Sequence, residues 1–313
     1  MANRLEARSL GLLGPEVSVI GLGCNNFGRR VDLEGTRAVV DAALEEGITF
    51  FDTSNTYGDP HGRSEEFLGE ALQGRRDQVI LATKFGMDMG DGLGPRGSHD
   101  YILQAVEASL RRLQTDVIDY YWYHQPDGVT PIAETLETLD GLVQSGIVRW
   151  IGASNFTASQ IEEADAVARD RGFARFTSIQ NNYSLLHREA EREVLPTCER
   201  LGLGFVPFFP LASGLLTGKY RRGETAPTGT RLAGRDQVAT SEQFDAVEAV
   251  ARFAADRDVP MIDVAIGALL ARPVVSTVIA GATKPEQVRQ NAAAARWHPT
   301  HGDLGELEEL LNR

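Results

Sequence analysis

The stretch Phe50-Phe51-Asp52-Thr53-Ser54-Asn55-Thr56-Tyr57-Gly58 (FFDTSNTYG) joins an apolar run directly to an acid, and a tyrosine follows five residues after that acid. Phe50 and Phe51 are typical of a buried strand, whereas Asp52 is costly to bury without a partner of opposite charge. The stretch therefore predicts a buried strand that ends at Asp52, followed by a turn of small residues that carries Tyr57.

A short β-branched or aromatic run followed by a longer amphipathic run recurs along the chain. These runs predict strands over 17–22, 48–52, 79–83, 117–123, 148–153, 176–180, 204–208 and 274–279. They predict helices over 33–46, 64–73, 99–113, 131–144, from 157 and over 188–201, with Ser64 as an N-cap. Short apolar strands of this kind are typical of parallel strands that are buried on both faces.

Eight such strand–helix units predict an α/β fold, a (β/α)8 TIM barrel formed by residues 1–313 as one domain. An N-terminal β-hairpin precedes the barrel, and an enlarged segment over 211–271 follows the seventh strand, with helices near 242–256 and 263–270. The alternative is a doubly wound sheet, which would need a G-x-G-x-x-G turn after its first strand. The turn over 21–28, GLGCNNFG, lacks the third glycine at the required place.

The composition, 42% hydrophobic and 24% charged, is that of a soluble globular protein. A net charge of -13 without a basic run argues against nucleic acid and anionic membranes as partners. The chain shows no apolar stretch long enough to span a bilayer and no secretory signal. Its two cysteines, Cys24 and Cys198, exclude a disulfide framework and indicate a reducing, cytoplasmic location.

Polar residues stand at the ends of three consecutive predicted strands. Asp52 ends the second strand and Tyr57 follows it, Lys84 ends the third, and His124 ends the fourth. Because the carboxyl ends of barrel strands meet at one mouth, we expect these four side chains to converge. Lysine is rare in this chain, which has only Lys84, Lys219 and Lys284 beside 28 arginines. Lys84 therefore indicates a place that requires a compact, titratable ammonium.

Together the four residues suit proton donation to a carbonyl that becomes an alkoxide. The ordinary pKa of tyrosine, about 10, is poorly matched to proton transfer at neutral pH, and a nearby Lys84 would lower it. Buried Lys84 needs Asp52 as its counter-charge. His124 can bind a substrate oxygen or relay a proton. Each residue alone could have a role in packing or capping. If all four had such roles, their positions on three consecutive strands would be a coincidence.

The chain resembles the aldo-keto reductases, NAD(P)H-dependent oxidoreductases built on a (β/α)8 barrel. The matching segments occur in order: FFDTSNTYG, ILATKFG, YYWYHQPD, GASNF, QNNYSLL, PLASGLLTGKY and IAGATKPEQVRQN. They span roughly residues 15–291, and the combination is specific although no single segment is. The resemblance implies a catalytic tetrad of Asp52, Tyr57, Lys84 and His124.

The resemblance also implies where the cofactor binds. Ser154, Asn155 and Gln180 would hold the nicotinamide amide, which needs both a donor and an acceptor. Phe208, where the family usually has tyrosine, would stack on the nicotinamide ring. The backbone of the loop after it would bind the pyrophosphate, with Lys219 nearby. The implied cofactor residues in this part of the chain are Gly23, Asp52, Ser154, Asn155, Gln180, Phe208, Leu211, Ser213, Gly214, Leu215 and Lys219.

The adenosine end is implied by the last matching segment. The residues are Gly281, Thr283, Lys284, Gln287, Gln290 and Asn291. A helix that begins at Pro285 would direct its N-terminus at a phosphate, and Lys284 adds a positive charge. Both favour NADP(H), with NAD(H) as the alternative. Many relatives have arginine at 283 or 287 and glutamate at 290, so the departures Thr283, Gln287 and Gln290 leave cofactor preference less secure than cofactor binding.

The resemblance predicts hydride transfer from the nicotinamide to an aldehyde or ketone, with Tyr57 as proton donor. No metal is needed, and the sequence has no His/Cys cluster to bind one. Two alternatives stay open: a regulatory module such as the potassium-channel β-subunits of the family, and a Schiff-base enzyme that uses Lys84. The predicted pocket for a small carbonyl or sugar comprises the loops 86–98 and 218–240 and the residues Asn25, Phe27, Tyr57, Phe85, Trp122 and His124. The oligomeric state stays open.

Overall fold

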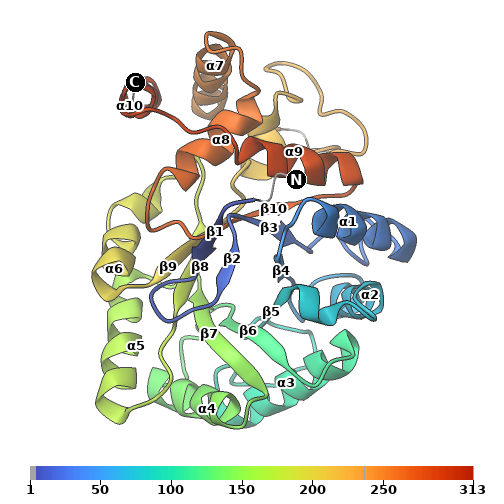
Figure 1. Cartoon of the computed structure of the whole chain (residues 1–313), viewed down its shortest axis with the longest axis vertical. Coiled ribbons are helices and arrows are strands. Elements are labelled where there is room, and N and C mark those ends of the chain that lie inside the picture. The colour runs from blue at the N-terminus through green and yellow to red at the C-terminus, as the bar shows by residue number, and fades with distance from the viewer. Residues whose placement is uncertain (1–4, 236, 313) are drawn as a thin grey trace.

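In the computed structural model, which describes residues 5–235 and 237–312, eight parallel strands form a ring surrounded by helices (Figure 1). The strands pair in the order β10-β3-β4-β5-β6-β7-β8-β9. The ring closes between β9 and the segment that leads into β10. There Phe205 N donates to Val274 O at 2.7 Å, and Ser276 N donates to Phe205 O at 3.0 Å. The predicted (β/α)8 barrel is therefore confirmed.

The strands of the barrel are β3 (Ile20–Gly23), β4 (Phe50–Asp52), β5 (Ile80–Phe85), β6 (Ile118–Tyr123), β7 (Val148–Ser154), β8 (Ser178–Asn182), β9 (Gly204–Phe208) and β10 (Val278–Gly281). The α-helices are α1 (Leu33–Glu45), α2 (Arg63–Ala71), α3 (His99–Leu113), α4 (Ile132–Gln144), α5 (Ala158–Arg171), α6 (Val194–Leu201), α7 (Ser241–Ala255), α8 (Met261–Leu270), α9 (Pro285–Ala294) and α10 (His301–Leu311). Short 3₁₀ helices are η1 (Arg76–Gln78), η2 (Glu189–Glu191) and η3 (Ala212–Thr217). Among the described residues, no helix combines the length and apolarity that a bilayer crossing requires.

The N-terminal hairpin covers the end of the barrel at which the strands begin. Its strands, β1 (Ala7–Ser9) and β2 (Glu16–Ser18), pair antiparallel. Leu10 of the hairpin is fully buried and packs with the side chains that fill the barrel interior. The other buried members of this interior cluster are Val17, Phe50, Ala82, Tyr120, Trp122, Val206 and Ile279. The hairpin therefore closes the floor of the barrel.

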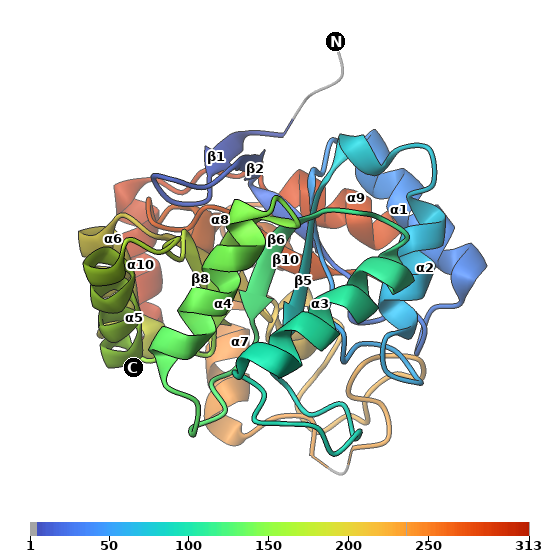
Figure 2. The ribbon, with the colours of Figure 1, turned by 90° about the horizontal axis from the view of Figure 1, so that it is seen from below.

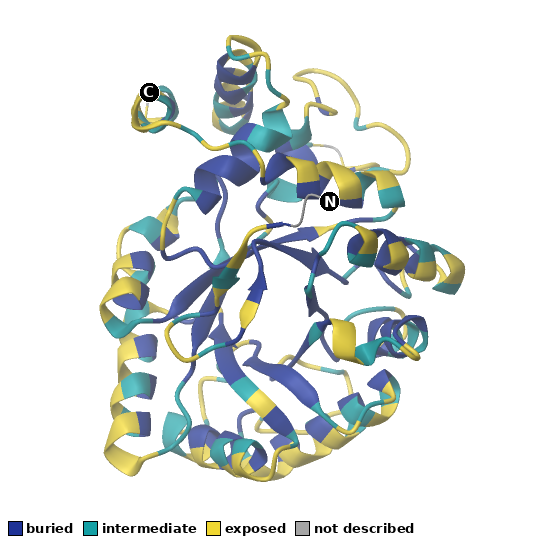
Figure 3. Ribbon diagram, in the orientation of Figure 1, coloured by how far each residue is buried: buried dark blue, intermediate teal, exposed yellow. Residues whose placement is uncertain are grey.

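The long loops lie at the opposite end. In the view from below, the hairpin is at the top of the molecule and the loops 86–98 and 218–240 hang at the bottom (Figure 2). The strands are buried along most of their length, and the surrounding helices expose only their outer faces (Figure 3). The mouth formed by the carboxyl ends of the strands is therefore the end at which loops can build a site.

The enlarged segment after the seventh barrel strand contains the two predicted helices, α7 and α8. A capping box fixes the start of α7, because Thr240 Oγ1 accepts from Gln243 N and Gln243 Oε1 accepts from Thr240 N. The segment forms a second apolar cluster around Leu216, Val250 and Val264. This cluster lies outside the barrel and supports the loop 218–240.

Three predicted elements are divided in the structure or differ from it by more than two residues at a boundary. The strand predicted over 17–22 is split between β2 and β3, because the chain passes from the hairpin into the barrel at Val19. The strand predicted over 274–279 begins at Val278, although Val275 still bridges to Phe205. The helix predicted over 188–201 is divided into η2 and α6.

Ser64 is not the N-cap of α2. The helix begins at Arg63 with Gly62 as its N-cap, in a left-handed conformation (φ 88°). Ser64 is instead fully buried, and its hydroxyl donates to Cys24 O at 2.8 Å and lies 2.9 Å from Thr53 Oγ1. It therefore fastens α2 to the loops after β3 and β4. The helix α10 was not predicted.

Candidate active site

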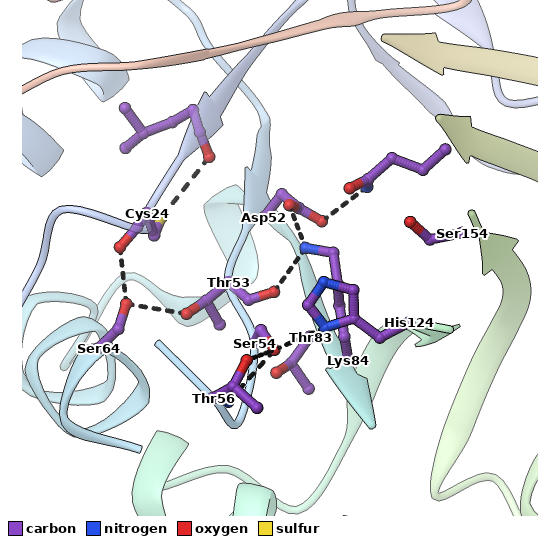
Figure 4. Close-up of polar contacts among 12 residues, drawn as sticks. Cys24, Asp52, Thr53, Ser54, Thr56, Ser64, Thr83, Lys84, His124 and Ser154 are labelled. Atoms are coloured by element: carbon purple, nitrogen blue, oxygen red, sulfur yellow. Dashed lines mark hydrogen bonds and ion pairs between the residues drawn. The ribbon is translucent and has the colours of Figure 1, made fainter. Parts of the chain in front are cut away.

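Strand alternation decides which residues of β4 and β5 face the barrel axis. Phe50 packs in the interior cluster and Phe51 in the layer between strands and helices. Asp52, one residue further, therefore faces inward again. In β5, Ala82 belongs to the interior cluster, and Lys84 shares its side of the strand. The two charged side chains meet inside the barrel at the carboxyl ends of neighbouring strands (Figure 4).

Lys84 and Asp52 form a buried ion pair. Lys84 Nζ donates to Asp52 Oδ2 and also to Thr53 O at 2.8 Å, and Gln180 Nε2 donates to Asp52 Oδ1 at 3.2 Å. Burial by itself would lower the pKa of Lys84, but the charge of Asp52, its hydrogen bond to Lys84 and the charge of Tyr57 together outweigh burial and raise this pKa above its usual value. Burial raises the pKa of Asp52, and the Lys84 ammonium opposes that rise. A protonated, paired lysine is a poor nucleophile, which argues against the Schiff-base alternative.

Tyr57 stands in the turn after β4, beside Lys84 and His124. Lys84 Nζ lies 5.1 Å from the centroid of the Tyr57 ring, and the centroid of the His124 ring lies 5.9 Å from it, with the rings nearly perpendicular. Burial raises the pKa of Tyr57 above its usual value, and the Lys84 ammonium offsets only part of that rise. The predicted effect of Lys84 is present, but the prediction of a lowered pKa is wrong because burial outweighs it.

His124 is neutral and held from two sides. Its backbone N–H donates to Phe85 O at 2.7 Å, and its Nδ1 lies 3.1 Å from Ser54 Oγ (Figure 4). Burial, followed by the charge of Lys84, lowers the pKa of His124 well below its usual value. A neutral imidazole carries one ring proton. When the Ser54 hydroxyl donates to Nδ1, that proton is on Nε2, which can then donate to a substrate oxygen.

The residues predicted to hold the nicotinamide amide lie next to this group. Ser154 ends β7 and is buried, and Asn155 follows it in a left-handed conformation (φ 59°). Asn155 Nδ2 donates to His124 O at 3.0 Å and to Ser154 Oγ at 3.1 Å. Gln180 uses its amide nitrogen to bind Asp52. Asn155 and Gln180 donate through their amide nitrogens, so their amide oxygens are the atoms that could accept a hydrogen bond from a carboxamide.

The loop after β9 has an unusual backbone that fits the predicted pyrophosphate site. Ala212, Ser213 and Gly214 have φ values of 46°, 60° and 97° in succession. Strained backbone of this kind is concentrated at ligand-binding loops, where consecutive N–H groups can surround an anion. A Cβ built on Gly214 would lie 2.7 Å from Lys219 Nζ, so the ammonium lies directly against the loop. Phe208, just before the loop, packs edge-on against Phe209 at 5.2 Å.

The predicted adenosine site lies around the start of α9. Lys284 is the N-cap of this helix and is exposed, and Pro285 is its first residue. Gln287 Oε1 accepts from Thr283 N at 2.7 Å and from Thr283 Oγ1 at 3.1 Å, so these two side chains are engaged with each other. Gln290 is exposed, whereas Asn291 is buried.

Gly23 of β3 pairs with Gly281 of β10 next to this region. A Cβ on Gly23 would lie 2.9 Å from Ile279 Cγ2, which leaves no room for a side chain. A Cβ on Gly281 would meet Asn26 Nδ2 at 3.4 Å and Asn25 Oδ1 at 3.5 Å. Asn25, predicted for the substrate pocket, therefore lies beside a residue predicted for the cofactor. Asn26, which donates to Ala282 O at 3.3 Å, was not predicted at all.

Three aromatic residues predicted for the pocket are not brought to its surface. Phe27 and Phe85 are fully buried in the layer between strands and helices. Phe85 follows the inward-facing Lys84 and so points outward, where it stacks on Tyr123 with ring centroids 5.0 Å apart. Trp122 is fully buried in the barrel interior. Of the predicted pocket residues, Tyr57 and His124 are the pair that the structure places together.

The chain is similar to known proteins over most of its length. The model of the aldo/keto reductase family matches residues 19–312. The chain belongs to the aldo/keto reductase family. It is accordingly an oxidoreductase, and proteins of this family reduce carbonyl groups with nicotinamide cofactors.

Three relatives show the range of roles among similar chains. An uncharacterized oxidoreductase, YrpG, from Bacillus subtilis (strain 168) is 39% identical over 93% of this aldo/keto reductase and 91% of its own length. A probable voltage-gated potassium channel subunit beta from Oryza sativa subsp. japonica is 33% identical over 93% of this chain and 91% of its own length. L-glyceraldehyde 3-phosphate reductase from Escherichia coli (strain K12) is 32% identical over 93% of this chain and 88% of its own length.

Sequence reasoning missed two groups that touch the central residues of this aldo/keto reductase. Ser54 contacts His124, and the backbone oxygen of Thr53 accepts from Lys84. Both lie within the FFDTSNTYG stretch, so their nearness to Asp52 in the chain was an available signal. Which of the small residues turns toward the histidine depends on the course of the turn, which the sequence does not specify.

Proposed function

We propose that this aldo/keto reductase reduces a small aldehyde or ketone to an alcohol with NADPH, and that Tyr57 donates the proton. The observation that carries the proposal is the placement of the Tyr57 ring beside both the Lys84 ammonium, 5.1 Å from the ring centroid, and the ring of His124, 5.9 Å from it. Phenol, ammonium and neutral imidazole together can stabilise an oxygen on which negative charge develops.

Each of the four residues would have a separate role in the reduction. The bound cofactor supplies a hydride to the carbonyl carbon. Tyr57 gives its proton to the carbonyl oxygen, and Lys84 stabilises the phenolate that remains. Asp52 keeps Lys84 charged in its buried position. Neutral His124 orients the carbonyl through a hydrogen bond from Nε2.

The features that support cofactor binding are those of the loop after β9 and the start of α9. The succession of left-handed residues with Lys219 against Gly214 suits a pyrophosphate. The N-terminus of α9 with Lys284 as its cap suits the additional phosphate of NADPH. Preference for NADPH over NADH rests on Lys284, because Thr283 and Gln287 are uncharged and bind each other.

The test is to mix the protein with NADPH and a reactive aldehyde such as 4-nitrobenzaldehyde and to follow the loss of NADPH absorbance. Tyr57→Phe should abolish turnover and leave the Kd of NADPH unchanged, because phenylalanine keeps the ring and removes only the proton donor. A Tyr57→Phe variant that reduces the aldehyde at the wild-type rate would show that another group donates the proton.

A second candidate is a cofactor-binding regulatory module, which the relative named as a potassium channel subunit favours. The complete set of Asp52, Tyr57, Lys84 and His124 supports the enzyme instead. The two roles are separated by one measurement: a regulatory module would bind NADPH stoichiometrically and turn over none of a broad panel of aldehydes and ketones.

We also propose a cytoplasmic location and a small-molecule carbonyl, with no nucleic acid or membrane, as the partner. Cys24 and Cys198 are both free and buried, which suits a reducing compartment. The net charge of -13 opposes binding to nucleic acid and to anionic membranes.

A further inference from the structure

Trp122 carries a polar atom that has no partner in the barrel interior. The side chain is fully buried, and its Nε1 forms no hydrogen bond with any of the described residues. An indole N–H can only donate, and a buried donor that is left unpaired destabilises a fold. An acceptor close to this nitrogen would therefore be strongly favoured.

The strand register brings the indole next to the buried ion pair. Trp122 of β6 pairs with Lys84 of β5, and Asp52 of β4 pairs with Ala82, two residues before Lys84. Because side chains alternate along a strand, Asp52, Lys84 and Trp122 all point toward the barrel axis. Trp122 also belongs to the interior cluster that contains Phe50, two positions before Asp52 in β4. The indole and the ion pair therefore share the inside of the barrel.

Two neighbours fix the direction of the indole ring. Gly152 of β7 pairs with Trp122, and a Cβ built on Gly152 would lie 2.6 Å from Trp122 Cζ3 and 2.7 Å from Cε3. The six-membered ring thus fills the space that the glycine leaves open. Tyr120 packs against the same indole, with ring centroids 4.5 Å apart. Since Nε1 lies on the opposite edge of the indole from Cε3, the N–H is directed away from β7, toward the side on which β5 and β4 lie.

The Asp52 carboxylate can accept a further hydrogen bond. Its two oxygens offer about four lone-pair sites, and the side chains that donate to them are Lys84 and Gln180. Burial raises the pKa of Asp52, whereas Lys84, Gln180 and the indole of Trp122 lower it. No hydrogen bond of regular geometry joins Trp122 to Asp52, so the indole is close enough to act on the carboxylate without being fully aligned with it.

We propose that Trp122 is a positioning residue, whose indole N–H holds the Asp52 carboxylate ionised and in place for Lys84. Asp52 in turn keeps Lys84 charged, and Lys84 stabilises the phenolate that Tyr57 leaves after proton donation. Trp122 is fully buried, so it acts through Asp52 and not on the substrate. The inference rests on the proposed function, because it assigns Trp122 a part in the same proton donation.

The contact itself is tested by NMR of the whole chain, whose three tryptophans, Trp122, Trp150 and Trp297, give three indole N–H signals. Trp150→Phe and Trp297→Phe each remove one signal, which leaves the third to Trp122. Asp52→Asn should move the Trp122 proton upfield, because a hydrogen bond to a charged carboxylate is stronger than one to a neutral amide. If the unpaired Lys84 prevents this variant from folding, Asp52→Asn/Lys84→Met takes its place. A Trp122 signal that does not move would overturn the inference.

The effect on catalysis is tested with Trp122→Phe, which keeps an aromatic ring in the interior and removes the donor. With 4-nitrobenzaldehyde, kcat should fall about tenfold, the loss expected for a hydrogen bond to a charged group, and the Kd of NADPH should stay within about twofold of the wild-type value. The matched control is Trp150→Phe, because Trp150 packs against the same interior cluster from β7. It should keep the wild-type kcat.

The pH profile separates support of Asp52 from a role in packing alone. Loss of a donor to the ionised carboxylate raises the pKa of Asp52, and the charge on Lys84 depends on that carboxylate. The activity of Trp122→Phe should therefore decline on the acid side about one pH unit above the wild type, a shift that corresponds to about 1.4 kcal/mol. The other titratable groups that interact with Asp52 are Lys84, Tyr57 and Cys24, and both proteins contain them.

The outcomes distinguish the inference from the proposed function. A Trp122→Phe variant with the wild-type kcat, or with a lower kcat but an unshifted acid limb, would overturn the inference alone. A wild-type protein that reduces no aldehyde would overturn the proposed function and the positioning role with it.

Discussion

Ser54 Oγ lies 3.1 Å from His124 Nδ1, and both side chains are buried at the carboxyl ends of the strands. The same hydroxyl lies 3.0 Å from Thr56 Oγ1 and 3.4 Å from Asn55 Oδ1, so its single proton has three competing acceptors. The histidine is kept neutral by burial and by Lys84, which lower its pKa. Which ring nitrogen carries the proton therefore depends on Ser54.

We predict that Ser54→Ala lowers kcat/KM for carbonyl reduction about three- to tenfold, as expected for the loss of a hydrogen bond of about 0.5–1.5 kcal/mol. The physical reason is that the Nε2–H tautomer of His124 is no longer favoured. Nitrogen-15 chemical shifts of the imidazole report the tautomer directly, and Ser54→Thr, which keeps the hydroxyl, is the control. An unchanged tautomer in Ser54→Ala would contradict a positioning role for this serine.

Removing Lys84 should destabilise the protein as well as inactivate it. Lys84→Met leaves the buried carboxylate of Asp52 unpaired, which typically costs about 3–5 kcal/mol and should lower the Tm measured by circular dichroism. The double variant Asp52→Asn/Lys84→Met removes both charges and should recover most of the Tm but none of the activity. A double variant with wild-type kcat would show that the ammonium does not assist Tyr57.

The pH dependence of reduction should reflect a raised phenol pKa. Tyr57 must be protonated to donate a proton. The rate of carbonyl reduction is therefore at its maximum below the pKa of Tyr57 and falls as the pH rises through that pKa. Because burial raises that pKa above 10.0, kcat/KM should stay constant from about pH 6.5 to 9, beyond the usual titration range of histidine. Alcohol oxidation needs the phenolate and should accelerate with pH. A decline of the reduction rate near pH 7 would contradict this assignment.

The two exposed lysines should affect cofactor binding differently. Lys284→Gln should raise the Kd of NADPH about tenfold without changing that of NADH, because only NADPH carries the additional phosphate. Lys219→Gln should weaken both cofactors, because both contain the pyrophosphate. Titration of each variant with both cofactors gives the four values. Equal losses in Lys284→Gln for NADPH and NADH would place the phosphate elsewhere.

Much of the barrel follows from alternation that is visible in the sequence. The side chains of Phe50, Phe51 and Asp52 point alternately toward the barrel axis, away from it and toward it again. Applied to β5, the same alternation predicts that Phe85, which follows the inward-facing Lys84, points away from the axis. The prediction of Phe85 as a pocket residue ignored that signal. The N-terminal boundary was harder, because nothing in the run over 17–22 shows that the chain changes sheets at Val19.

Other features of the site depend on distances between residues that are far apart in the sequence, which a local sequence pattern does not predict. The net shift of the Tyr57 pKa is a balance between burial and the field of Lys84, and the depth of the site decides that balance. The contact between the loop after β3 and the loop 218–240 is a second example, because Arg30 Nη2 donates to Gly229 O at 3.0 Å although the two residues are 199 positions apart in the chain.

The scarcity of lysine also makes the protein a selective target for amine chemistry. Lys84 is sealed inside the barrel, while Lys219 and Lys284 are exposed in two of the loops proposed to hold the cofactor. Acylating reagents applied to the folded chain should thus modify those two side chains and spare Lys84. Mass spectrometry of the labelled protein with and without NADPH then gives a footprint of cofactor occupancy at these two lysines.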